Sequence, residues 1–207
     1  MIAIIDYGVG NIRSIANMIA KIGGRSRIVT NYQDLNDASR IILPGVGSFD
    51  DGMSKLNLSG LIPALNEKVL GKKIPVLGIC LGAQMMTLDS EEGSIDGLGW
   101  FNANTFKFNF DGVVKKIPIP NIGWRTVRPV GNCPLLKGFN EHPRFYFVHS
   151  YYMKPCGVNE DIVSMNTDYG VEYACGLSND NIHCVQFHPE KSHKYGMQFF
   201  KNFQEMS

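Results

Sequence analysis

The segment that decides the fold reads Ile74-Pro-Val-Leu-Gly-Ile-Cys80-Leu-Gly-Ala-Gln84. An apolar strand runs into a glycine-flanked cysteine and then into a predicted helix, which places Cys80 at a sharp strand-to-helix turn. Glycines suit such a turn because the backbone on either side approaches its neighbours too closely for side chains. The helix N-terminus favours a thiolate, and the N–H of Leu81 would point to where an oxyanion forms. Cys80 is therefore a candidate nucleophile, although a buried apolar cysteine before a glycine-rich turn has the same sequence pattern.

The first half of the chain alternates between short apolar runs and helical patterns. Strands are expected at 2–5, 27–30, 40–43 and 74–79, and helices at 12–22 and 61–70. Strands separated by helices need right-handed crossovers, which predicts an α/β fold with a mainly parallel sheet. The second half favours strands, at 101–110, 123–130, 144–149, 162–165 and 183–187, before a closing helix at 191–203. Residues 89–100 are expected to be a surface loop, not a boundary, so residues 1–207 are predicted to form a single domain.

Composition excludes several classes of protein. The 207 residues carry a net charge of +1, which argues against a dedicated nucleic-acid binder or a polybasic membrane protein. No apolar run approaches the ~20 residues that cross a bilayer, and the N-terminus does not have the pattern of a signal peptide. Five cysteines without a C-x-x-C pair indicate reduced thiols in the cytoplasm. No cofactor is expected, nor a metal, because the five histidines form no cluster with cysteines.

A cysteine nucleophile needs a base, and the base needs a group that orients it. His188-Pro-Glu190 can supply both, because Pro189 favours an extended conformation at His188. Residues i and i+2 of an extended segment face the same side, so the carboxylate of Glu190 can reach one imidazole nitrogen. The other nitrogen is then free for Cys80. Alone, this motif also fits a histidine at a strand end beside a surface glutamate.

Two glycine-rich loops follow buried strands. Leu43-Pro-Gly-Val-Gly-Ser48 could offer a second N–H to an oxyanion beside the nucleophile, or it could be a plain turn. Gly8-Val-Gly10 is a weak phosphate-binding candidate, because Arg13 stands where G-x-G-x-x-G has its third glycine.

Taken together, these motifs resemble those of class I glutamine amidotransferases. The cysteine segment with Gln84 and His188-Pro-Glu190 carry this resemblance. Further segments resemble, in order and over nearly the whole chain, the glutaminase subunits of imidazole glycerol phosphate synthases. They are Ile5-Asp-Tyr-Gly-Val-Gly-Asn11, Leu43-Pro-Gly-Val-Gly47, Gly123-Trp124, Tyr146-Phe-Val-His-Ser-Tyr151 and Gln186-Phe-His-Pro-Glu-Lys-Ser192.

The resemblance implies a class I glutamine amidotransferase fold, with a mostly parallel central sheet flanked by helices and an added antiparallel part. It implies that a thioester forms on a cysteine and that ammonia passes to a (β/α)8 synthase subunit, which makes imidazole glycerol phosphate and AICAR in histidine biosynthesis. The residues that it assigns fall into four groups. They are the catalytic Cys80, His188 and Glu190; the oxyanion-hole residues Leu81, Val46 and Gly47; the glutamine-binding Gln84, Ser150 and Tyr151; and Trp124, Tyr146 and Lys191 near the partner.

The chain departs from the family pattern at one place. Where the family usually has Pro-His-x-Gly-Trp-Asn, this chain has Pro120-Asn-Ile-Gly-Trp-Arg125. Asn121 and Arg125 flank Trp124, so we expect them at the partner interface, where they could select the partner. Three alternatives stay open: a paralogue that supplies ammonia for sugar amidation, a catalytically silent regulatory subunit, and a cysteine peptidase or esterase.

Overall fold

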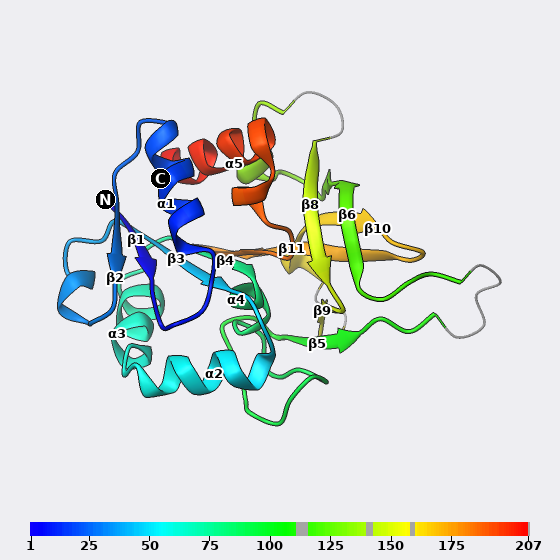
Figure 1. The fold of residues 1–207 in the computed structure, drawn as a ribbon, viewed down its shortest axis with the longest axis horizontal. Coiled ribbons are helices and arrows are strands. Elements are labelled where there is room, and N and C mark those ends of the chain that lie inside the picture. Colours follow the sequence, from blue (N-terminus) through cyan, green and yellow to red (C-terminus); the bar gives the residue numbers. More distant parts are fainter. Residues whose placement is uncertain (111–115, 140–142, 158–159, 207) are drawn as a thin grey trace.

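The computed structural model describes residues 1–110, 116–139, 143–157 and 160–206, and Figure 1 shows their arrangement. The helices are α1 (Ile12–Lys21), α2 (Phe49–Leu58), α3 (Ile62–Asn66), α4 (Leu81–Gln84) and α5 (His193–Glu205). A π-helical turn (Glu67–Gly71) continues α3, and a 3-10 turn (Pro189–Lys191) precedes α5. The strands are β1 (Ile2–Ile5), β2 (Ser26–Val29), β3 (Arg40–Gly45), β4 (Val76–Cys80), β5 (Ala103–Lys107), β6 (Asn121–Thr126), β7 (Arg128–Pro129), β8 (Arg144–His149), β9 (Tyr151–Pro155), β10 (Val163–Asp168), β11 (Glu172–Asn179) and β12 (Ile182–Val185).

A mixed sheet forms the centre of the described structure, in the strand order β2-β1-β3-β4-β12-β11-β10-β7. Five strands, β2, β1, β3, β4 and β12, are parallel to one another, as the alternation of strands and helices predicted. Both faces of this half are covered, so successive residues of β1 belong to different cores. Ala3 and Ile5 pack on one side of the sheet, and Ile2 and Ile4 pack on the other.

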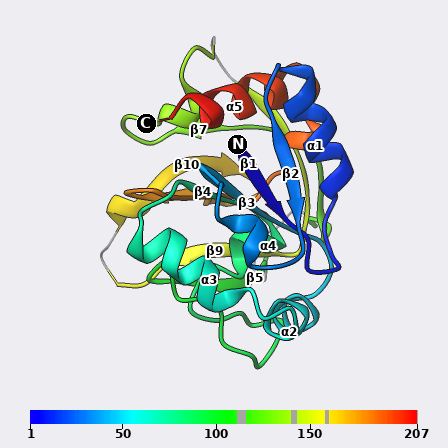
Figure 2. The same ribbon diagram turned by 90° about the vertical axis from the view of Figure 1, so that its left-hand side faces the viewer.

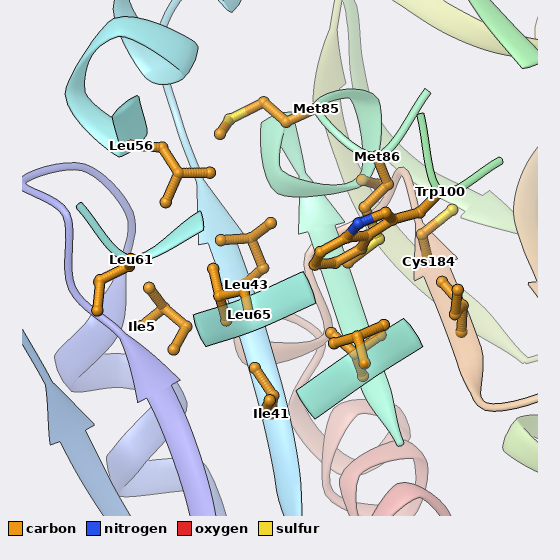
Figure 3. Packing of buried hydrophobic residues seen from close by; sticks show 14 of the residues in the cluster. Ile5, Ile41, Leu43, Leu56, Leu61, Leu65, Met85, Met86, Trp100 and Cys184 are labelled. Carbon is orange, nitrogen blue, oxygen red and sulfur yellow. The ribbon is translucent and has the colours of Figure 1, made fainter. Parts of the chain in front are cut away.

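Helices cover the two faces of the parallel half. Figure 2 shows α1 and α5 on one side of the sheet and α2 and α3 on the other. Ile15 of α1 and Phe199 of α5 are fully buried in the core on the side of Ile2 and Ile4. Figure 3 shows the second core, where Leu56 of α2 and Leu65 of α3 face the apolar side chains of β1 and β3. The closing helix and the helix expected from residue 61 are thus confirmed, with small shifts of their ends.

The antiparallel part extends the same sheet and adds two small sheets. β11, β10 and β7 follow β12 in antiparallel pairs. Among the described residues, β5 pairs with β9 and β6 pairs with β8, both antiparallel. These features confirm the predicted α/β fold. No helix of the described residues is long and apolar enough to cross a membrane.

Four features differ from the sequence predictions. Helix α2 was not predicted, because a glycine stands in its apolar stripe at Gly52. A Cβ there would lie 2.9 Å from Leu81 Cδ2 and from Met85 Sδ, so the missing side chain allows close packing of α2 on α4. Strands β9 and β11 were also missed, and the strand expected at 123–130 is divided into β6 and β7.

Candidate active site

Cys80 occupies the strained turn that its sequence predicts. It ends β4 and precedes α4 with φ 55° and ψ −112°, a conformation that few non-glycine residues adopt. A Cβ on Gly82 would lie 2.0 Å from the carbonyl oxygen of Leu43, and one on Gly78 would lie 2.9 Å from the Cα of Ala83. The two glycines are therefore required by close backbone packing, which fixes the direction in which the thiol points.

His188 and Glu190 come together, but only His188 is extended: Pro189–Lys191 forms a 3-10 turn, so the geometry differs from the fully extended segment expected from the sequence. His188 has φ −104° and ψ 93°, and its Nδ1 lies 2.8 Å from Oε1 of Glu190. Both side chains are almost fully buried, and Asn11 Nδ2 donates a second bond, of 3.4 Å, to the same carboxylate oxygen. The backbone N–H of His188 bonds to the carbonyl of Tyr146, which fixes the segment against β8.

The imidazole of His188 is also hydrogen-bonded to Cys80. Burial by itself lowers the pKa of His188, but the charge of Cys80, its hydrogen bond and the Glu190 carboxylate outweigh burial and raise this pKa to about 10. The imidazolium is therefore the stable form at neutral pH. The sequence could not place these two residues together, and the structure does so with the imidazole between the thiol and the carboxylate.

A cavity of roughly 390 Å³ opens beside Cys80. The residues that line it include every one expected in the oxyanion hole and in the glutamine pocket, together with side chains that the sequence did not indicate. The lining consists of Val46, Gly47, Cys80, Leu81, Gln84, Glu92, Pro120, Val148, His149, Ser150, Tyr151, His188 and Lys191.

Glu92 is the acidic group of this cavity that the sequence analysis missed. Its Oε2 accepts the N–H of Phe49, the first residue of α2, at 2.9 Å. The segment around Glu92 has the composition of an exposed loop, so no local signal separates this residue from surface glutamates. The fixed carboxylate is a suitable partner for a ligand's ammonium group.

The loop 45–47 is held at one end and free at the other. The hydroxyl of Tyr7 donates a 2.6 Å hydrogen bond to the carbonyl of Pro44, and a Cβ on Gly45 would lie 2.5 Å from the N of Gly82. In contrast, the side chain of Val46 is 39% exposed. Gly47 has φ 105°, and no heavy atom lies within 4 Å of a Cβ built on it. Any reorientation of a peptide in this loop is therefore confined to its last two residues.

The residues expected at a partner interface fall into two groups. Trp124, Tyr146 and Lys191 lie together, with the two rings 6.2 Å apart and Lys191 Nζ 5.9 Å from the Tyr146 ring centroid. Asn121 is fully buried within this chain, and a place at the partner interface stays a prediction for Asn121 and Arg125. The amide of Asn121 bonds to His149, and Arg125 folds back onto it, with Nε 3.0 Å from Oδ1. This burial could not be read from the motif, because β8 and β11 supply the groups that satisfy the amide.

Comparison with known proteins identifies the class. Residues 3–206 match the family described as Glutamine amidotransferase class-I. The chain belongs to this family. It is 47% identical over 206 residues to the imidazole glycerol phosphate synthase subunit HisH 2 of Pseudomonas aeruginosa, with 100% of both chains covered. It is 50% identical over 203 residues to the subunit HisH 2 of Methanococcus maripaludis, with 98% of both chains covered. Within its family, this is a HisH-like chain, which confirms the resemblance drawn from the sequence motifs.

Solved structures of lower identity share the fold. The structure of PurLQS from Thermotoga maritima matches with a TM-score of 0.76 at 18% identity, covering 98% of this chain and 96% of that one. The glutaminase domain of Trypanosoma brucei CTPS, solved with bound acivicin, matches with a TM-score of 0.65 at 16% identity, covering 100% of this chain and 94% of that one. These likenesses support the fold of the class.

Proposed function

We propose that this chain is the glutaminase subunit of an imidazole glycerol phosphate synthase and acts as a single glutamine amidotransferase domain. It hydrolyses L-glutamine to glutamate and ammonia, and the ammonia serves histidine biosynthesis. The observation that carries the proposal is the contact of Cys80 with a His188 that Glu190 orients, at the wall of a cavity of suitable size.

The first half of the reaction forms a thioester. The thiolate of Cys80 attacks the side-chain amide carbon of glutamine, and the carbonyl π electrons move to the oxygen. When the tetrahedral intermediate collapses, the imidazolium of His188 donates its proton to the departing nitrogen. The C–N bond then breaks, ammonia leaves, and the glutamyl group stays on the sulfur. The raised pKa of His188 keeps this proton available at neutral pH.

The second half releases glutamate. Neutral His188 takes a proton from water, and the resulting hydroxide attacks the thioester carbon. Collapse of the second tetrahedral intermediate breaks the C–S bond and restores the thiolate–imidazolium pair. Glu190 orients the imidazole and stabilises the imidazolium through the 2.8 Å hydrogen bond that the two side chains share.

The cavity supplies groups for the rest of the substrate. The N–H of Leu81 is one oxyanion donor, and the 46–47 peptide is the second. Gln84, Ser150 and Tyr151 form the wall that receives the glutamine backbone, and the carboxylate of Glu92 attracts its ammonium group.

The ammonia acceptor is bound by a partner. We assign the partner as a (β/α)8 synthase subunit that docks over Trp124, Tyr146 and Lys191 to form a heterodimer in the cytoplasm. Lys191 lines the glutamine cavity and also lies against the Tyr146 ring, so it reaches from the reaction site to this surface. An interface at this position would receive ammonia close to where it is released.

The test is glutamine hydrolysis by the full chain with its (β/α)8 partner, followed by assay of imidazole glycerol phosphate. Cys80→Ala should abolish hydrolysis. Cys133→Ala is the matched control, because both cysteines are 8% exposed, and it should keep activity. An electrophilic glutamine analogue should label Cys80 alone. Hydrolysis that survives Cys80→Ala would overturn the catalytic assignment, and formation of an aminated sugar in place of imidazole glycerol phosphate would overturn the pathway.

A further inference from the structure

Gln186 contacts the reacting sulfur, and the mechanism above gives it no role. It follows β12, whose last register pair with β4 is Val185–Ile79, so Gln186 and Cys80 are the next residues at the carboxyl ends of neighbouring parallel strands. The side chain of Gln186 is fully buried, and its Nε2 lies 3.8 Å from Cys80 Sγ. Its backbone N–H bonds to the carbonyl of Cys175 on β11, which fixes the residue from the other side.

The direction of the Gln186 amide follows from its neighbours. One terminal atom of Gln84 contacts both the backbone carbonyl of Tyr151, at 3.2 Å, and the amide of Gln186, at 3.0 Å. A carbonyl oxygen only accepts, so this atom of Gln84 must be its nitrogen. Gln186 must then turn its oxygen to Gln84, which leaves its NH2 group facing Cys80. The assignment of the Gln186 NH2 group as the donor to Cys80 thus depends on a backbone carbonyl, which can only accept hydrogen bonds.

The Tyr151 carbonyl is itself held in place by a second set of residues. His149 Nδ1 lies 2.7 Å from this carbonyl, and burial lowers the pKa of His149 to about 4, so the ring is neutral. Nδ1 therefore carries the proton, and Nε2 accepts from Asn121 Nδ2 at 3.1 Å. The oxygen of Asn121 faces Arg125, which can only donate. Each polar group between Arg125 and the sulfur of Cys80 therefore has a fixed role as hydrogen-bond donor or acceptor.

We propose that Gln186 donates an N–H to the Cys80 thiolate and that Gln84, bonded to the Tyr151 carbonyl, locks its amide in the donating orientation. The inference rests on the proposed function and adds a group that stabilises the nucleophile before substrate binds. A hydrogen bond to a charged acceptor is stronger than one between neutral groups, and the surroundings of Gln186 are fully buried.

Other charged or titratable groups near Cys80 act from different elements. His188, with Glu190 behind it, contacts the sulfur from the turn after β12. The phenol of Tyr7, from the segment after β1, stays protonated, because burial and then the charge of Cys80 raise its pKa. Glu92 and Lys191 line the cavity. Gln186 is a neutral donor, so replacing it with leucine removes the hydrogen bond without changing any of these charges.

The experiment measures alkylation of Cys80 by iodoacetamide against pH in the full chain, with the modified peptide quantified by mass spectrometry. Gln186→Leu should move the midpoint of the rate profile upward by about one to two pH units, the equivalent of one hydrogen bond to a charged group. With the partner and glutamine present, kcat should fall more than KM rises, because Gln186 touches the nucleophile.

Asn202→Leu is the matched control. It also removes a buried amide, one that bonds to the carbonyls of Leu135 and Lys137. None of these three residues lines the cavity beside Cys80, so the variant should leave the midpoint in place. If Gln186→Leu does not fold, Gln84→Met tests the lock, and it should raise the midpoint by less than the full loss of the donor. A midpoint within ~0.3 pH unit of wild type in the folded variant, with wild type active, would overturn the inference. An inactive wild-type complex would instead overturn the proposed function.

Discussion

Gly82→Ala should damage both stability and catalysis through a single backbone contact. The new Cβ would lie 2.0 Å from the carbonyl oxygen of Leu43 and 3.0 Å from the carbonyl carbon of Pro44, whereas ordinary contacts begin at 3.4 Å. These atoms belong to β3, which is paired with β1 on one side and β4 on the other, so the strand cannot yield. Helix α4 must therefore retreat by roughly 1 Å, and it carries the N–H of Leu81 away with it.

The size of the effect follows from this geometry. Overpacking a close-packed interior costs about 1–3 kcal/mol, and the upper value applies here because the obstacle is backbone. For a chain of this length, about 3 kcal/mol corresponds to a Tm lower by roughly 6–12 °C. Misplacement of the nucleophile and of one oxyanion donor by about 1 Å should lower kcat for glutamine on the order of 10²-fold.

The assay is thermal unfolding of the full chain, with glutaminase kinetics in the presence of the partner. Gly71→Ala is the matched control, because no heavy atom lies within 4 Å of its added Cβ, and it should be neutral or stabilise by up to ~1 kcal/mol. A Gly82→Ala protein with the Tm and kcat of wild type would refute the reasoning, since the added methyl group would then fit between α4 and β3 without displacing either.

Three further predictions concern the site and its surroundings. Cys80→Ala should lower the pKa of His188 well below about 10 in a histidine NMR titration, because the charge and hydrogen bond of Cys80 are the leading causes that raise it; an unchanged pKa would contradict the pairing. His188→Ala should lower kcat by ~10²–10⁴-fold or more, and Glu190→Gln should leave more activity, because Glu190 only orients and stabilises; the reverse order would refute these roles. Asn121→Ala should lower the free energy of unfolding by about 1–3 kcal/mol, because it leaves buried partners unsatisfied, whereas Ile122→Ala, at a 54% exposed neighbour, should change it by less than ~0.5 kcal/mol; equal denaturation midpoints would contradict the network.

Local patterns predicted the parts of the fold that local energetics decide. The inner strands β1, β3 and β4 are mostly apolar and buried on both faces, so their sequences differ from the segments around them. The glycines around Cys80 indicate the turn, because no other residue fits the backbone contacts that such a turn makes. Helix α2 left no such pattern, since Gly52 stands where its stripe would carry an apolar side chain, and the reason for that glycine lies in the helix opposite.

The site needed the tertiary structure. Gln186 and Cys80 are 106 positions apart, and their contact depends on the parallel pairing of β12 with β4, which no local pattern records. Glu92 has the sequence surroundings of a surface loop. Its carboxylate accepts a hydrogen bond from the start of α2, and the residue lines the cavity. Asn121 stands close to a partly exposed tryptophan, yet its amide is buried against groups from β8 and β11.

By itself, the sequence determined the alternation of strands and helices in the first half of the chain, the strained cysteine turn and the His-Pro-Glu segment. Each of these rests on interactions between residues close in sequence, so each leaves a readable pattern. Only the tertiary structure decided which groups meet at the sulfur, which polar side chains are buried and which way each amide turns. Those outcomes depend on the pairing of distant strands and on hydrogen-bond partners supplied from elsewhere in the chain, and a buried polar group is stable only where such partners are present.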